Sequence, residues 1–404
     1  TSTERGFDVP FQTIVNHNLS WDNTLYLGDG KVKGVLGYTS NQRQEFEETI
    51  VAPALDMDLN SFTYNLKWFL PNKGRIIDWI VGAQGLIQKN TNSGEELLIP
   101  DASTKDIGVF VVASAARDQW YFQGGLRFDE RQIQADSYME AGEVLFNNYE
   151  NQFDAVNFAF GLAYELNQSI VKLNISSGFR APNTSELLSN GVHEGTNQYV
   201  VGNSALESEA ATQIDMAFDF NSTHFDFSFQ PFYNNIKNYI YLSPSNTIIE
   251  GSPRFDYTQS DAILYGGELG FHYHPHQIHW LHLESNVSMV LAENGDGDPL
   301  PLIPANRWRS TARAEWANQF LNSVFITYQY TASQNRAGLF ETSSPSYGLM
   351  DVGLSLSIHK NVTASLGVTN LFDTNYIDHL SRLKSLEVPN IGRNITAKVI
   401  WELD

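Results

Sequence analysis

Apolar and polar residues alternate with a period of two along most of this 404-residue chain. Phe225, Phe227 and Phe229 alternate with polar neighbours, and the pattern recurs over 324–330 and 352–358. Successive side chains of a β-strand point to opposite faces, so these segments predict strands with one apolar and one polar face. No stretch approaches the roughly 18 consecutive apolar residues of a membrane-spanning helix. The chain is therefore expected to be all-β.

The connections between the predicted strands alternate between tight and long. Tight turns are expected at 28–30, 72–74, 221–223, 275–276 and 359–360, and long segments at 49–58, 90–104, 135–151, 182–207, 243–260, 293–306 and 371–392. Outer-membrane barrels have short periplasmic turns and longer external loops. A soluble sandwich also alternates, but its apolar face packs on a second sheet. The asymmetry favours a transmembrane antiparallel β-barrel.

The number of predicted strands is about seventeen, which is odd, whereas bacterial single-chain barrels have even numbers. The first strand, near 11–27, and the last, 394–404, then run in the same direction, toward the periplasm. This parity predicts that Thr1 lies outside the cell and that an odd number of strands precedes the chain.

The charge and the residue types exclude several functions. The formal net charge of −21 argues against nucleic-acid binding, which needs a basic face. Acidic loops instead raise the local concentration of cations. The absence of Cys excludes disulfides and thiolate metal sites. No Ser-His-Asp, P-loop or HExxH pattern is present, so we expect no catalytic residues and no enzyme activity.

One long loop carries a recognisable motif. Phe179-Arg180-Ala181-Pro182 is followed by His193 and then by Gly202-Asn203-Ser204-Ala205-Leu206. This order resembles the Phe-Arg-Ala-Pro, His and Gly-Asn-Pro-x-Leu signature of TonB-dependent receptors, with Ser204 in place of the usual Pro. Three further segments, 37–46, 367–376 and 389–394, are similar to barrel strands and strand ends of that family.

The resemblance implies a barrel of about twenty-two strands that is filled by an N-terminal plug. Residues 1–404 would then be the C-terminal barrel portion of such a receptor, with loop 182–207 external and with the plug and about five strands absent. The expected location is the outer membrane of a Gram-negative bacterium. The expected partners are the N-terminal plug-plus-strands segment, the TonB complex acting through the plug, membrane lipid and, as a further candidate, a surface lipoprotein.

Two segments, 190–199 and 378–384, resemble receptors implicated in zinc uptake. This resemblance implies that His193 and Glu45 are metal ligands, and Glu194 and His379 are candidates beside them. A set of His and carboxylate ligands without Cys suits zinc or a harder divalent ion. The alternative for Glu45 is an internal ladder of ion pairs among Arg and Glu, or a contact with the plug. His193 could instead pack against other loops, and His379 could pack against Tyr376.

Zinc import is the first functional hypothesis, and the ligand is cargo, because no permanent cofactor is expected. The nearest alternative is a receptor for haem or siderophore-iron, for which Arg307, Arg309 and Arg313 could guide an anionic substrate. A passive porin-type channel and a structural or adhesive barrel are the alternatives from other classes. Five further histidines bracket one tight turn and are interpreted as surface residues outside the site, although they could scavenge metal: His272, His274, His276, His279 and His282.

Overall fold

The computed structural model describes residues 9–47, 49–94, 97–140, 142–193, 198–316 and 319–402. Contacts divide the chain into two compact units. Unit 1 comprises 1–161, 175–212 and 236–261, and unit 2 comprises 162–174, 213–235 and 262–404. Among the described residues, no helix combines the length and the apolar character that crossing a membrane requires.

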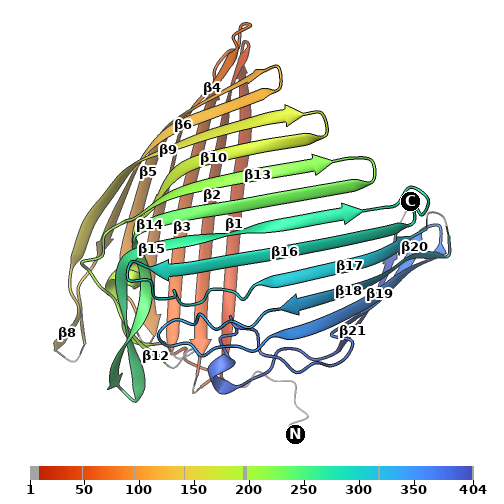
Figure 1. The fold of residues 1–404 in the computed structure, drawn as a ribbon. Helices are drawn as coiled ribbons and strands as arrows, with labels where there is room; N and C mark the ends of the chain where they lie inside the picture. The colour runs from red at the N-terminus through yellow and green to blue at the C-terminus, as the bar shows by residue number, and fades with distance from the viewer. Residues whose placement is uncertain are drawn as a thin grey trace. The chain divides into compact units, whose positions relative to one another are not determined.

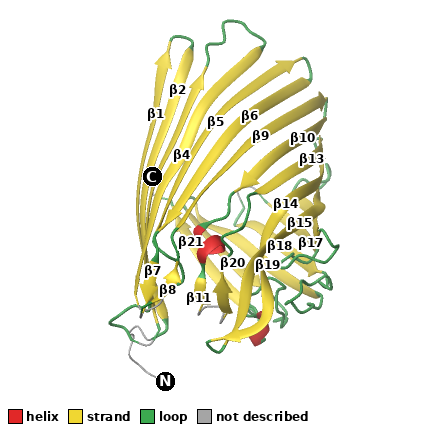
Figure 2. Cartoon of the chain, turned by 90° about the vertical axis from the view of Figure 1, so that its left-hand side faces the viewer, coloured by secondary structure: helices red, strands yellow, loops and turns green. Residues whose placement is uncertain are grey.

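The described part of the chain is built almost entirely from antiparallel strands (Figures 1 and 2). Four of its twenty-one strands are short and lie within predicted loops: β7 (Tyr138–Glu140), β8 (Glu143–Phe146), β11 (Asn190–His193) and β12 (Gln198–Val201). The other seventeen are long, which confirms the predicted number. The alternation of apolar and polar residues in the sequence thus predicted the all-β, barrel-type fold correctly.

Unit 1 contains a meander of six long strands, each paired with the next in sequence. In Figure 1 these strands run side by side in chain order: β1 (Phe11–Leu27), β2 (Gly30–Phe46), β3 (Leu55–Phe69), β4 (Ile77–Gly94), β5 (Ala102–Arg117) and β6 (Trp120–Ala135). Five further strands lie partly in each unit: β9 (Tyr149–Leu166), β10 (Ser169–Arg180), β13 (Glu209–Asn221), β14 (Phe225–Ile249) and β15 (Ser252–Tyr273).

Unit 2 continues with a second meander. Its strands follow β15 in the order β16 (Leu281–Asn294), β17 (Arg307–Glu315), β18 (Leu321–Thr331), β19 (Tyr347–His359), β20 (Val362–Thr369) and β21 (Asn394–Trp401). A short helix α1 (Thr184–Leu188) and a 3-10 helix η2 (Lys384–Leu386) lie among loop segments, and both are red in Figure 2.

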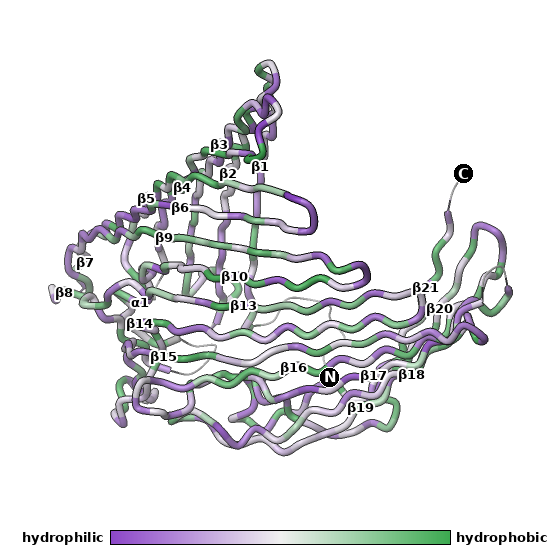
Figure 3. The backbone as a smooth tube through the Cα atoms, turned by 45° about the horizontal axis from the view of Figure 1, so that its top comes forward, coloured by the Kyte–Doolittle hydropathy of each residue, from purple (hydrophilic) through white to green (hydrophobic). Residues whose placement is uncertain are grey.

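The strand registers separate an apolar face from a polar face. Across β3 to β6, Trp68, Val81, Val111 and Leu126 stand opposite one another, and Leu126 remains 58% exposed. The neighbouring positions of the same strands include Lys67 and Arg127, which lie on the opposite face. Figure 3 shows this alternation as changes between green and purple along the strands. Large apolar side chains exposed in rows are typical of the lipid-facing surface of a barrel.

The prediction of a long loop over 243–260 is wrong. Strand β14 extends to Ile249 and β15 begins at Ser252, so a tight turn joins two extended strands. The short strand β12 pairs in parallel with this extension, with Tyr199 opposite Arg254. In a loop, the backbone N–H and C=O groups of this segment would hydrogen-bond to water. Here they are paired with neighbouring strands instead. A further connection, between β18 and β19, was not predicted.

Candidate functional site

The loop that follows β10 is anchored by Arg180, the arginine of the Phe-Arg-Ala-Pro motif. Its Nη1 donates to both oxygens of Glu186 at 2.8 Å, and its Nε and Nη2 donate to Glu209 at 2.8 and 2.5 Å. Glu209 Oε1 also accepts a hydrogen bond from the backbone nitrogen of Ile240 at 2.8 Å. Fork-shaped pairing of this kind is geometrically specific. The signature arginine thus joins the start of the loop, its helix and the strand that follows.

Helix α1 begins at a capping box directly after the motif. The Asn183 side chain accepts a hydrogen bond from the Glu186 backbone nitrogen, and the Glu186 side chain accepts one from the Asn183 backbone nitrogen, both at 2.9 Å. This reciprocal pair satisfies two backbone donors that the first helical turn leaves open. Glu186 therefore serves the helix and Arg180 at the same time. The spacing Asn183-x-x-Glu186 was a readable signal for this helix.

The second half of the signature packs against the same helix. A Cβ on Gly202 would lie 2.5 Å from the backbone nitrogen of Leu188, so only glycine allows this approach. Leu206 is 2% exposed and belongs to an apolar cluster with Ile133, Leu187 and Ile240. The signature residues therefore build a rigid loop base.

The polar face of unit 1 is hollowed beside this loop base. The hollow has a volume of about 940 Å³ and is lined by Asp106, Arg127, Asp129, Arg131 and Arg180, among others. Arg131 donates to Asp106 at 2.7 and 2.6 Å, and Arg127 Nε donates to Asp129 at 2.7 and 2.6 Å. Because these arginines are paired with carboxylates, the wall offers hydrogen-bonding groups without a large local charge. Such a surface suits contact with polar cargo or with a polar protein domain.

Glu45 lies on the polar face of β2, as expected, with Arg43 on the same face. The two side chains form an ion pair along the strand. This is the internal ion pairing that the sequence left open as the alternative to metal binding. Glu45 remains a candidate ligand only if it exchanges this partner.

Two of the predicted ligands fall at the edge of the described structure. His193 ends β11, and its backbone pairs with Gln198. The side chain of His193 and all of Glu194 lie outside the described residues. Both lie on unit 1 segments, as does Glu45.

His379 belongs to unit 2 and is buried, with 5% of its surface exposed. Its Nδ1 lies 2.9 Å from Ser344 Oγ and accepts from Lys384 Nζ at 3.1 Å, while its Nε2 is 3.7 Å from Glu341 Oε2. Burial and the neighbouring Lys384 ammonium lower the pKa of His379 below its usual value. The neutral imidazole is therefore favoured, and because Nδ1 accepts from Lys384, its single proton is on Nε2, on the side of Glu341.

Arg307 and Arg313, two of the three candidates for anion binding, are paired with carboxylates within unit 2. Arg313 contacts Glu284 at 2.7 Å and Glu315 at 3.0 Å, and Arg307 lies 3.5 Å from Asp378. These pairs reduce the positive charge that an anionic substrate would meet.

Three histidines that were set aside in the sequence come together in unit 2. Donor atoms of His272, His274 and His282 all lie within 4.8 Å of one another. The three side chains are half-buried, whereas His276 and His279 of the same turn are exposed. Their alternate spacing before the turn was the available signal, since i and i+2 share a strand face.

Comparison with known proteins identifies the fold. A family model described as TonB dependent receptor-like, beta-barrel matches residues 2–371. This chain belongs to the TonB-dependent receptor β-barrel family. Members of this family are outer-membrane receptors and transporters, not enzymes.

Solved structures of metal transporters and of a hemophore receptor share the fold at low sequence identity. The copper transporter OprC is 17% identical with a TM-score of 0.79, over 96% of this chain and 65% of that one. The FrpB iron transporter from Neisseria meningitidis (F3-3 variant) is 15% identical with a TM-score of 0.73, over 96% and 63%. A double mutant of the Serratia marcescens hemophore receptor HasR, in complex with its hemophore HasA and heme, is 14% identical with a TM-score of 0.72, over 96% and 66%. This chain thus spans less than two thirds of the length of these proteins.

Proposed function

We propose that this chain forms barrel wall, external loops and part of the ligand site of an outer-membrane receptor that actively imports a metal species, with zinc as the first candidate. The observation that carries the proposal is the family match over residues 2–371. A metal-containing cargo is supported by the similar structures, which are a copper transporter, an iron transporter and a hemophore receptor in complex with its hemophore and heme.

The zinc candidate rests on the segments 190–199 and 378–384 and on the ligand types they contain. His193, Glu194, Glu45 and His379 remain predicted ligands. An N-terminal plug would supply the remaining ligands and the contact with TonB. Imidazole and carboxylate donors without thiolate suit Zn²⁺.

The test is accumulation of radioactive zinc by cells that carry the full-length receptor, with and without TonB. We expect saturable zinc uptake that requires TonB and that falls at least tenfold in His193→Ala. His359→Ala, at the tight turn between β19 and β20, is the matched control and should retain uptake.

Other outcomes would identify the alternatives. TonB-dependent uptake of haem or ferric siderophore without zinc uptake would favour the iron receptor. Zinc passage that is independent of TonB and does not saturate would favour a passive channel.

A further inference from the structure

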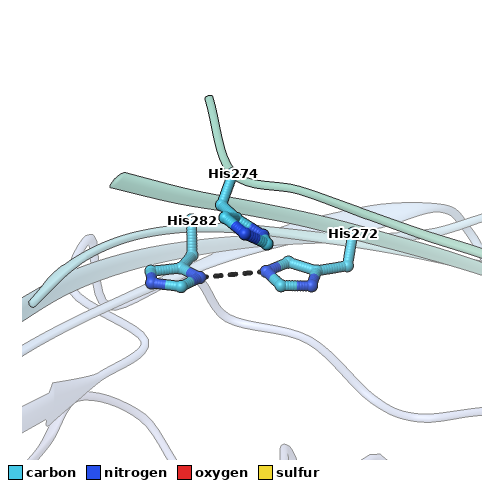
Figure 4. A group of neighbouring side chains, drawn as sticks. All are labelled: His272, His274 and His282. Atoms are coloured by element: carbon cyan, nitrogen blue, oxygen red, sulfur yellow. Dashed lines mark hydrogen bonds between the residues drawn. The ribbon is translucent and has the colours of Figure 1, made fainter. Parts of the chain in front are cut away.

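Three imidazoles converge where β15 ends and β16 begins, at the tight-turn end of these strands. His272 lies on β15, His274 directly follows its end, and His282 is the second residue of β16. In Figure 4 the rings of His272 and His282 face each other, and His274 lies beside them. His272 Nε2 and His282 Nδ1 are 3.0 Å apart.

These histidines lie on the polar face of the sheet. His272 is opposite Glu284 and His282 is opposite Arg313, whereas the intervening Tyr273 is opposite Leu283. Tyr273 is 40% exposed on the apolar face. An ion bound by the three histidines would therefore be reached from the polar side.

A carboxylate sets the orientation of His272. Its Nδ1 lies 3.2 Å from Asp226 Oδ2 of β14, which leaves Nε2 directed toward His282. A carboxylate on the far nitrogen of an imidazole is the arrangement that orients metal-bound histidines. On the other side, His282 Nε2 lies 3.9 Å from Glu315 Oε2.

His274 has a buried ring nitrogen that none of the described residues satisfies. Its Nδ1 is shielded from solvent and has no hydrogen-bond partner. Buried polar atoms are normally paired, so an unpaired one indicates a missing partner such as an ion.

From these contacts we infer that His272, His274 and His282 form a binding site for a divalent first-row transition metal ion. Two nitrogen ligands at about 2.0–2.1 Å from a tetrahedral Zn²⁺ are roughly 3.3 Å apart, close to the separation of His272 and His282. Three neutral imidazoles suit Zn²⁺ or Cu²⁺ and leave a fourth position for water or cargo.

This site differs from the four predicted ligands and does not rest on the proposed function. Strand β16 has 14 residues, so at about 3.3 Å per residue its turn end is roughly 45 Å from its loop end. A haem or siderophore receptor with this sequence would carry the same site.

Three more imidazoles adjoin the site within unit 2. The His224 ring is 5.1 Å from that of His274 and 4.9 Å from that of His276, and His276 is 5.0 Å from His279. Partial burial and the neighbouring imidazoles lower the pKa of His224. His276 and His279 lie beside the proposed ligands but are not ligands themselves. A variant that replaces both therefore tests whether metal binding depends on neighbouring imidazoles in general or on the three proposed ligands.

The experiment is calorimetric titration of the metal-stripped full-length receptor in detergent with Zn²⁺ alone, repeated with Co²⁺ as an optical probe. We expect His272→Ala/His282→Ala to lose one equivalent of bound metal and its Co²⁺ spectrum. Asp226→Asn should keep the stoichiometry and weaken binding by about 10- to 100-fold, because it removes the orienting carboxylate.

The controls are His359→Ala and His276→Ala/His279→Ala, which should bind Zn²⁺ as the unaltered receptor does. Heat-modifiable migration on gels verifies that each variant is folded, and His282→Gln replaces the double variant if that one does not fold. Unchanged stoichiometry and affinity in folded His272→Ala/His282→Ala or His282→Gln would overturn the inference. Metal binding is measured in detergent without TonB, so its result is independent of the uptake experiment. The metal site can be present in a receptor that does not import zinc, and it can be absent from one that does.

Discussion

Arg180 donates two hydrogen bonds to Glu209, from Nε at 2.8 Å and from Nη2 at 2.5 Å. The Glu209 side chain is only 11% exposed and also accepts from the backbone of Ile240. The loop between them therefore starts and ends at one ion pair.

Breaking this ion pair should loosen the loop. We expect Arg180→Ala to cost about 1–3 kcal/mol, because Glu186 and Glu209 lose hydrogen bonds to a charged partner. The measurement is limited proteolysis of loop 182–207, which should be cut faster at unchanged barrel migration. Lys172→Ala, which removes the more exposed Lys172–Asp219 pair, is the matched control and should cost less than about 1 kcal/mol. Equal cleavage of both variants would contradict the anchoring role.

Gly202→Ala should displace helix α1. The new Cβ would lie within 2.6 Å of backbone atoms of Leu187, Leu188 and Ser189, which cannot move independently. Overpacking of this kind costs about 1–3 kcal/mol, and hydrogen exchange of the α1 amides should rise accordingly. Gly178→Ala, where a Cβ meets nothing within 4 Å, is the control and should leave exchange unchanged.

The loop around His379 should become less stable in mild acid. Because the folded pKa of His379 is below its usual 6.5, the opened loop takes up a proton that the folded loop does not. Stability is thus complete above about pH 6.5 and falls by at most about 1.4 kcal/mol per pH unit below it, until the folded pKa is reached.

Tryptic cleavage at Arg382 and Lys384 as a function of pH measures this effect. His379→Gln should abolish the pH dependence because it removes the titrating group. A pH dependence that persists in His379→Gln would assign the effect to other residues.

A charged side chain on the apolar face should lower the free energy of unfolding. Leu126→Arg is expected to cost about 2–4 kcal/mol if this side chain faces lipid near the bilayer midplane. Gln123→Arg, on the polar face of the same strand β6, is the matched control. The comparison uses guanidinium unfolding from lipid vesicles, and equal costs would be inconsistent with the assignment of the two faces.

The local alternation of apolar and polar residues was sufficient to predict the long strands. The first predicted strand, near 11–27, coincides with β1, because the alternation of apolar and polar residues is a local property of the sequence. The extension of β14 and β15 was not predicted, and its pairing partner β12 lies 55 residues away in the sequence, as Tyr199 opposite Arg254 shows. A single sequence carries no signal for such a partner.

The sequence by itself determined the seventeen long strands, most of the connections between them, and the family signature, because a period of two and turn chemistry are local properties. Only the tertiary structure decided what the polar groups do. It joined Arg180 to Glu209, which is 29 residues away, and it brought Asp226 to His272, 46 residues away. Strand register determines which distant residues come into contact, and register depends on hydrogen bonding across the whole sheet rather than on any one segment.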